Sequence, residues 1–255
     1  MTITISGASL RYERLGAGKP VLLLHGWGAS VEAMRSIAQC VASLGYEAVS
    51  LDFPGFGQSG DPPGPWGVPE YAACTRAFME ALGIIGCDVI AHSFGGRVAI
   101  YLASEEPALF NRLVLVDAAG VKPRRKPRYY LRVYAYKLGK KLTKIPWLDR
   151  LFRLSEKQKQ AGSEEYRQLS GDMRAAYVKI VNLDLSSRLS QIPNETLLIW
   201  GEKDMDTPLW MGQKMEREMQ NAGLAVIPGA GHFSYAEDYP RFCSILRALF
   251  GGKQG

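Results

Sequence analysis

The sequence has no long apolar run and contains few cysteines. No hydrophobic stretch in the 255 residues approaches the length of a membrane-spanning helix. The amino-terminal segment alternates like a strand and lacks the basic start and apolar core of a signal peptide, so we expect a cytoplasmic protein. The four cysteines form no Cys-x-x-Cys pair, which argues against a zinc site or a disulfide framework. We therefore predict reduced, mostly buried thiols at Cys40, Cys74, Cys87 and Cys243.

Two glycine-rich stretches have part of a nucleotide-binding motif without its context. Residues 55–60 match the dinucleotide spacing, but the proline-rich segment 61–65 follows them, so no helix would present its N-terminus to a pyrophosphate. Residues 16–19 lack the spacer and the hydroxyl residue of a phosphate-binding loop. We therefore expect no nucleotide cofactor, and no spacing in the chain predicts a metal site.

Strand and helix patterns alternate over most of the chain. A hairpin pattern covers residues 2–14, and continuous apolar runs typical of buried parallel strands follow at 21–24, 48–51, 89–91, 113–116, 196–200 and 224–227. Helical patterns lie between or after them, at 31–44, 69–82, 98–103, 209–220 and 239–250. This alternation predicts an α/β fold with a mostly parallel, doubly wound sheet and helices on both faces.

One aromatic-rich region interrupts the alternation. Residues 121–186 show helical patterns only, and we predict that they form a cap inserted into one core, residues 1–120 and 187–255. Within the cap, residues 122–159 contain fourteen basic residues against two acidic ones, so this segment carries +12 and the rest of the chain −6.

The basic segment allows three interpretations. The simplest is a cap helix over residues 131–145 that buries one apolar face and exposes its charges to solvent. The alternatives are attraction of an anionic substrate and, less favoured, contact with an anionic membrane surface. No nucleic-acid-binding motif accompanies the charge, so we expect no nucleic-acid partner.

The stretch from Asp88 to Arg97 carries the clearest chemical signal. A short apolar run precedes Ser93, the small residues Gly95 and Gly96 follow it, and a helical pattern begins at once. A strand that turns so sharply into a helix needs small residues, because the backbones crowd. The turn would hold the Ser93 hydroxyl at the positive end of the helix, where a developing anion is stabilised. The alternative is an ordinary strand–glycine–helix turn with an incidental serine.

A nucleophilic serine needs a base, and the base needs an orienting acid. Among the three histidines, His232 is the best candidate, because it lies in a glycine-rich loop after the last strand. His92 adjoins the serine on a strand, so its side chain should diverge. His25 more plausibly hydrogen-bonds the loops around it. Asp204 follows the strand at 196–200 and is the preferred acid, with two alternatives, Asp117 and Asp206.

These motifs together resemble the α/β-hydrolase superfamily. The resemblance rests on the serine turn, where Ala91 replaces the usual first glycine, on the chain order Ser93, Asp204, His232, and on the loops at 25–26, 52–59 and 201–208. It implies an α/β-hydrolase fold with a helical cap and a Ser-His-Asp triad. It also implies an oxyanion hole formed by the backbone N–H groups of Trp27 and Phe94. The candidate substrate-pocket residues are His25, Trp27, Phe94 and Phe233.

The resemblance implies a serine hydrolase that cleaves a small-molecule acyl ester through an acyl-enzyme intermediate, without metal or cofactor. Serine in place of aspartate at the turn argues against the dehalogenase and epoxide hydrolase branches. The loop after His25 differs from the His-Gly-Gly-Gly loop of some lipases. Carbon–carbon bond hydrolase, thioesterase, lactonase and perhydrolase remain alternatives on the same triad. A non-catalytic binding protein that uses the basic cap is less favoured, and nothing in the sequence indicates the oligomeric state.

Overall fold

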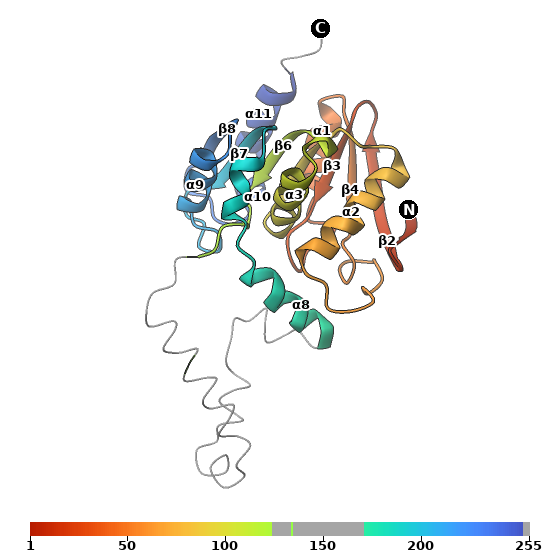
Figure 1. The fold of residues 1–255 in the computed structure, drawn as a ribbon. Coiled ribbons are helices and arrows are strands. Elements are labelled where there is room, and N and C mark those ends of the chain that lie inside the picture. The colour runs from red at the N-terminus through yellow and green to blue at the C-terminus, as the bar shows by residue number, and fades with distance from the viewer. Residues whose placement is uncertain (124–133, 135–170, 252–255) are drawn as a thin grey trace.

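The computed structural model describes residues 1–123, 134 and 171–251. Its centre is an eight-stranded sheet with the order β1-β2-β4-β3-β5-β6-β7-β8 (Figure 1). β2 pairs antiparallel with β1 and β4, and the other neighbours are parallel, which confirms the predicted mostly parallel sheet. The strands are Thr2–Ile5, Ala8–Gly16, Pro20–Leu24, Glu47–Leu51, Cys87–His92, Phe110–Val116, Glu195–Gly201 and Ala222–Ile227.

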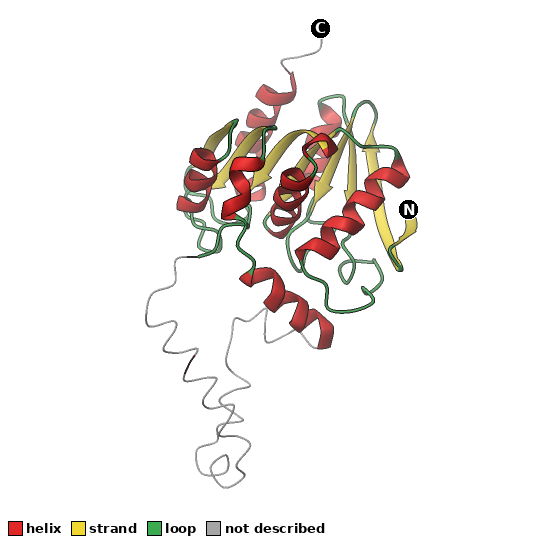
Figure 2. Ribbon diagram, viewed as in Figure 1, coloured by secondary structure: helices red, strands yellow, loops and turns green. Residues whose placement is uncertain are grey.

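Helices cover both faces of the sheet (Figure 2). The strand β3 shows why its sequence is an uninterrupted apolar run. Leu22 and Leu24 belong to the apolar cluster on one face, whereas Leu23 belongs to the cluster on the other. A strand buried on both faces needs apolar residues at every position. The first face is covered by α2 (Val68–Leu82), α3 (Phe94–Glu105) and α9 (Trp210–Glu218), and the second by α1 (Arg35–Ser43) and α11 (Tyr239–Phe250).

The first helix begins later than its sequence pattern predicts. The pattern covers residues 31–44, but α1 spans Arg35–Ser43. The buried carboxylate of Asp52 accepts a hydrogen bond from the Val31 N–H at 2.6 Å, and turns occupy the residues up to the helix. A contact between segments distant in sequence thus holds residue 31 in the turns that precede this helix.

Between β6 and β7 the chain leaves the sheet and returns through α8 (Gly171–Asn182) and the short 3₁₀ helix Ser186–Gln191. α8 lies beyond one edge of the sheet, below α2 and α3 in the view of Figure 1, and its residues Ala176 and Ile180 are buried. The predicted basic cap helix at 131–145 lies outside the described residues. The division into a core of residues 1–120 and 187–255 and a cap of residues 121–186 therefore stays a prediction.

Two expectations from composition can be compared with the structure. All four cysteines are free, and three of them are buried, as predicted. Within the part of the chain that the structure describes, no helix has both the length and the apolar character that crossing a membrane requires.

Candidate active site

Strand β5 turns into helix α3 at Ser93. This residue has backbone angles φ +50° and ψ −110°, a combination that residues other than glycine rarely adopt. A Cβ on Gly95 would lie 2.3 Å from the backbone oxygen of Leu24, and one on Gly96 would lie 2.5 Å from the Ala118 Cβ. Both glycines are therefore needed for the turn, as the sequence predicts, and the turn holds Ser93 at the carboxyl edge of the sheet.

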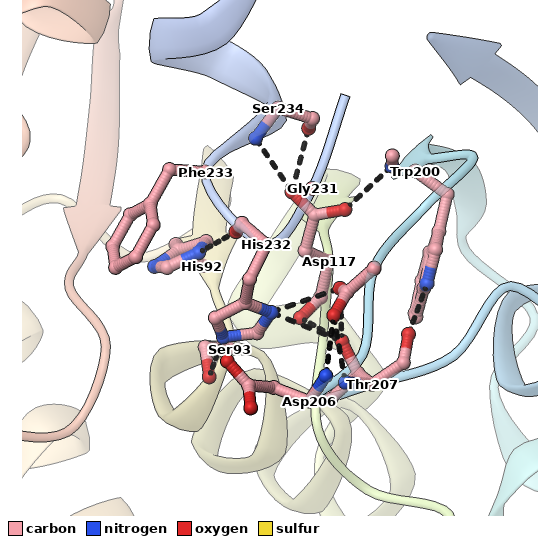
Figure 3. A network of polar contacts seen from close by, with 12 residues as sticks. His92, Ser93, Asp117, Trp200, Asp206, Thr207, Gly231, His232, Phe233 and Ser234 are labelled. Atoms are coloured by element: carbon pink, nitrogen blue, oxygen red, sulfur yellow. Dashed lines mark hydrogen bonds and ion pairs between the residues drawn. The ribbon is translucent and has the colours of Figure 1, made fainter. Parts of the chain in front are cut away.

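Three residues from distant segments form a continuous hydrogen-bonded chain at this edge. His232 Nε2 lies 3.0 Å from Ser93 Oγ (Figure 3). His232 Nδ1 lies 2.8 Å from Asp204 Oδ2. Asp204 follows β7 and His232 follows β8, so neighbouring parallel strands bring their loops together. The geometry is that of a Ser-His-Asp triad, and it joins the residues that the sequence analysis selects.

The electrostatics of the hydrogen-bonded series Ser93, His232 and Asp204 favour a basic imidazole at His232. Burial disfavours the Asp204 carboxylate, but hydrogen bonds from His232 and Thr207 outweigh it, so the pKa of Asp204 lies below its usual value. Burial also opposes a charged His232, but the hydrogen bond and charge of Asp204 outweigh it and hold the pKa of His232 above its usual value. Asp204 is thus ionised at neutral pH and makes His232 a stronger proton acceptor.

The structure distinguishes Asp204 from the two alternative acids. Asp204 Oδ1 accepts hydrogen bonds from the backbone N–H groups of Asp206 and Thr207 at 2.8 and 2.9 Å. The Thr207 Oγ1 lies 2.7 Å from Asp204 Oδ2. The side chain of Asp206 lines the cavity instead of bonding to His232. The carboxylate of Asp117 bonds to Gly201 and Ser234. Among the three acids, only Asp204 lies within hydrogen-bond distance of the imidazole.

Asp117 connects the loops that carry the other two members of the triad, a role that the sequence did not reveal. One carboxylate oxygen accepts the Gly201 N–H at 2.7 Å, and the other accepts the Ser234 N–H and hydroxyl at 3.1 and 2.6 Å (Figure 3). Its backbone oxygen lies 2.9 Å from the Thr207 Oγ1, so the Thr207 hydroxyl lies between this oxygen and Asp204 Oδ2. Burial raises the pKa of Asp117 to about 7, although the hydrogen bonds from Ser234 and Gly201 oppose the shift.

The remaining two histidines hold the loops of the site. His25 Nε2 accepts the Phe53 N–H at 3.0 Å, and its Nδ1 donates to the Gly26 oxygen at 2.7 Å, so the ring is neutral. Burial lowers the pKa of His25 to about 4. The prediction that His25 bonds its surrounding loops is confirmed. The structure does not place the candidate pocket residue His25 at the cavity, because this residue is fully buried and its neighbours Gly26 and Trp27 line the cavity instead.

His92 supports the loop of the catalytic candidate His232. Its Nε2 donates to the His232 backbone oxygen at 2.9 Å (Figure 3). Burial lowers the pKa of His92 to about 3, so the ring stays neutral. Its ring is therefore engaged with the histidine loop, which agrees with the interpretation of His92 as a poor base for Ser93.

The two predicted oxyanion donors border the nucleophile. Phe94 is the first residue of α3, so its N–H has no acceptor within the helix. Over residues 1–123 and 171–251, no backbone oxygen accepts the Trp27 N–H. A Cβ on Gly26 would lie 3.4 Å from the Ser93 Cβ, so the backbone before Trp27 passes close to the serine. This placement fits an oxyanion hole, which remains a prediction.

A cavity of about 800 Å³ opens at Ser93 and His232. Core loops and α8 line it together. The Trp27 ring packs edge-on against Phe94 and Tyr177, with ring centroids 5.5 and 5.4 Å apart. Phe233, which is 49% exposed, adds a further aromatic ring. Trp27, Phe94 and Phe233, three of the candidate substrate-pocket residues, line this cavity, and their role toward a substrate remains a prediction. Tyr177 and the buried Arg97 also line it, and the sequence did not single them out.

One group of potential metal ligands occurs among the described residues. Asp204, Asp206 and His232 place one ligand atom each within 4.8 Å of one another. However, both oxygens of Asp204 already accept hydrogen bonds, and the two nitrogens of His232 face Asp204 and Ser93. The donor set therefore fits a proton-transfer chain better than an open metal site.

Comparison with known proteins identifies the family. The sequence model of a family described as the alpha/beta hydrolase fold matches residues 19–239. The chain therefore belongs to the α/β-hydrolase family. This result and the observed sheet confirm the predicted fold class.

Individual relatives include enzymes of more than one specificity. The chain is 30% identical to 2-hydroxymuconate semialdehyde hydrolase from Pseudomonas putida, over 91% of this chain and 86% of that protein. It resembles the solved esterase from Exiguobacterium antarcticum with a TM-score of 0.77 at 20% identity, covering 99% of this chain and 100% of the esterase. It also resembles a solved variant of a meta-cleavage product hydrolase from Pseudomonas fluorescens, with a TM-score of 0.74 at 24% sequence identity. The match covers 98% of this chain and 97% of that hydrolase. Family and relatives support a hydrolase, and the structural likenesses show the fold.

Proposed function

We propose that this protein is a serine hydrolase that cleaves a small-molecule acyl ester with Ser93 as nucleophile. The observation that carries the proposal is the chain from Ser93 Oγ through His232 to Asp204, with contacts of 3.0 and 2.8 Å, at the wall of a cavity. A serine hydroxyl is a weak nucleophile unless an adjacent base removes its proton. We expect the reaction in the cytoplasm, without a nucleic-acid partner.

The first half-reaction forms an acyl-enzyme. Ser93 Oγ attacks the ester carbonyl while His232 Nε2 accepts its proton, and ionised Asp204 stabilises the imidazolium. The carbonyl oxygen becomes an oxyanion that accepts hydrogen bonds from the N–H groups of Trp27 and Phe94. The tetrahedral intermediate then collapses, the bond to the alkoxide breaks, and His232 returns the proton to this leaving group.

The second half-reaction releases the acid. His232 Nε2 takes a proton from a water molecule, whose oxygen attacks the acyl carbonyl. The bond to Ser93 Oγ breaks, and the serine recovers its proton from His232. These steps require only water and groups of this chain.

Hydrolysis of a carbon–carbon bond beside a carbonyl is the second candidate. The relative from Pseudomonas putida, at 30% identity over 91% of the chain, favours it. The same triad would serve, but the leaving group would be protonated at carbon instead of oxygen. Thioester, lactone and perhydrolysis chemistry stay alternatives on the same site.

Hydrolysis of 4-nitrophenyl esters of increasing acyl length, with Ser93→Ala as control, tests the proposal. We expect turnover that depends on Ser93, with a chain-length optimum that reports the depth of the cavity. Retained turnover in Ser93→Ala would overturn the assignment of the nucleophile. A fluorophosphonate probe that labels Ser93 without any ester turnover would favour the carbon–carbon substrate. Failure of both labelling and turnover would favour a non-catalytic binding protein.

A further inference from the structure

Arg97 is a buried cation in the wall of the active-site cavity. It lies on the first turn of α3, and the residue is only 6% exposed. Its guanidinium Nη1 donates to the Leu183 backbone oxygen, and no other hydrogen bond of this side chain occurs in the described regions. A guanidinium carries five N–H donors, so most of them have no protein acceptor there.

No carboxylate neutralises this charge within residues 1–123 and 171–251. None of the ion pairs in these regions involves Arg97. Asp184 acts on it only through its field, because the Asp184 Oδ1 already accepts the backbone N–H and the hydroxyl of Ser186 at 3.0 and 2.7 Å. Burial lowers the pKa of Arg97 to about 10, which still leaves it charged at neutral pH. A buried charge without a partner is unfavourable for the free protein.

The unpartnered N–H groups reach open space. Within the described part of the chain, Asn194 Oδ1 is the one side-chain nitrogen or oxygen that has neither access to solvent nor a hydrogen-bond partner. The N–H groups of Arg97 that have no protein acceptor therefore retain some access to solvent. Arg97 is one of the residues that line the cavity at Ser93, so the cavity is open space beside this side chain.

We propose that Arg97 binds a carboxylate of the substrate, so that the substrate class is an acyl compound that also carries a carboxylate. This inference rests on the proposed hydrolase function. The planar guanidinium matches a carboxylate through two parallel hydrogen bonds. The Arg97 N–H donates to the Ser93 backbone oxygen at 3.3 Å, so the two residues are about one helical turn apart, about 6 Å along the axis at 1.5 Å per residue. Both residues line the same cavity, so one substrate would contact Arg97 through its carboxylate and Ser93 through its acyl carbonyl.

Two matched substrate pairs test the proposal, one with the charge on the acyl side and one with it on the leaving group. The first pair is mono-4-nitrophenyl glutarate and its neutral methyl ester. The second is 4-acetoxybenzoate and its neutral methyl ester. In the wild type we expect the anionic member of at least one pair to have the higher kcat/KM.

Substitution of Arg97 should change this preference selectively. For the preferred anionic substrate, Arg97→Gln should raise KM about 10- to 100-fold, the range expected for hydrogen bonds to a charged group, and leave the neutral partner within about twofold. Arg97→Lys should restore part of the preference, because it keeps the charge without the planar fork. Arg188→Gln is the matched control, since Arg188 bonds to Ser104 and Glu105 of α3 away from the cavity.

Equal losses on both members of a pair in Arg97→Gln would overturn the proposal and leave Arg97 as a structural link to the segment at Leu183. Equal kcat/KM for both members of each pair in the wild type would overturn it as well. If Arg97→Gln fails to fold, inhibition of neutral-ester hydrolysis in the wild type decides: glutarate should compete with the ester and neutral glutaramide should not. Equal inhibition by the two compounds would reject the site.

Failure of the hydrolase proposal gives a different result. If no substrate in either pair is cleaved, thermal unfolding with glutarate still tests Arg97. Glutarate should raise the melting temperature of the wild type more than that of Arg97→Gln. Equal shifts, or no shift in the wild type, would overturn carboxylate binding whatever the reaction is.

Discussion

The cavity has two polar walls that differ in how their hydrogen-bonding groups are used. On the triad wall, both oxygens of Asp204 accept hydrogen bonds and both nitrogens of His232 face partners. On the wall formed with α8, Arg97 makes one hydrogen bond, to Leu183, among the described residues. Asp204 and Arg97 are both buried, at 3% and 6% exposure, so a difference in exposure does not explain the contrast between them.

The difference separates two tasks. Groups that stabilise a transition state act best when the protein fixes them beforehand, because no reorganisation is then needed during the reaction. A group that recognises a substrate must keep its donors free until the ligand arrives. The triad wall, whose hydrogen-bonding groups are already paired, therefore fits catalysis. The wall with Arg97, whose N–H donors are mostly unpaired among the described residues, fits substrate recognition. Substitutions of the residues at the cavity and in the loops around it test how far this division holds.

Ser93→Ala removes the nucleophile and leaves the rest of the triad wall in place. We expect kcat to fall by a factor on the order of 10⁶, as for loss of a triad serine, since oxyanion stabilisation alone remains. The melting temperature should change little, because the side chain is small and Ala can occupy the same turn. Ester kinetics and thermal unfolding of the same preparation check both expectations. A fall of less than tenfold would mean that Ser93 does not attack the substrate.

Asp204→Asn removes the negative charge of the carboxylate that bonds to His232 on the triad wall. We expect kcat/KM to fall by roughly 10⁴, because the amide no longer favours the correct imidazole tautomer. His232 must be neutral to accept a proton, so activity rises with pH through its pKa, which lies above the usual value in the wild type. Without the Asp204 charge this pKa falls, and the ascending limb of the pH–rate profile should move to lower pH. An unmoved limb would contradict the role of Asp204.

The matched control for Asp204 is Asp206→Asn. Asp206 contributes its backbone N–H to Asp204, and its side chain lines the cavity. The amide side chain leaves the backbone donor unchanged, so turnover should stay within a few-fold of the wild type. A loss as large as that of Asp204→Asn would mean that the two acids share the role.

Thr207→Val removes one hydroxyl from the triad wall and keeps the shape of the side chain. The Thr207 Oγ1 lies 2.7 Å from Asp204 Oδ2 and 2.9 Å from the Asp117 backbone oxygen. Hydrogen bonds to charged groups contribute about 1.5–3 kcal/mol, so we expect a 10- to 100-fold loss of kcat. Thr207→Ser keeps the hydroxyl and should retain most activity. Equal losses in both variants would assign the effect to packing of the Thr207 methyl group.

Asp117→Asn should change how stability depends on pH. Burial raises the pKa of Asp117 to about 7 in the folded protein, well above the ordinary carboxyl value. The stability that this raised pKa contributes is therefore fully present below about pH 4 and is lost as pH rises through about 7. The stability difference between wild type and variant should shrink by at most about 1.4 kcal/mol per pH unit across this window. Urea unfolding from pH 5 to 8 measures it, and a pH-independent difference would refute the shifted titration.

The sequence by itself determined the elements whose causes are local. The apolar run Val21–Leu24 requires burial on both faces, so it predicts an interior strand in any arrangement of the chain. Gly95 and Gly96 determine the sharp turn at Ser93, because a Cβ at either position would overlap the neighbouring backbone or side chain. The order of serine, aspartate and histidine along the chain indicated the family and the residues that now lie together.

Only the tertiary structure decided features that depend on approach between distant segments. Asp117, Asp204 and Asp206 all follow strands, and the direction of each side chain, set by the loops that surround it, places one of them on His232. His25 directly follows β3 near the cavity, yet its ring is buried and accepts the Phe53 N–H. Arg97 is one more basic residue in the sequence. It becomes a largely buried cation because folding covers most of its side chain without supplying a carboxylate partner from the described regions.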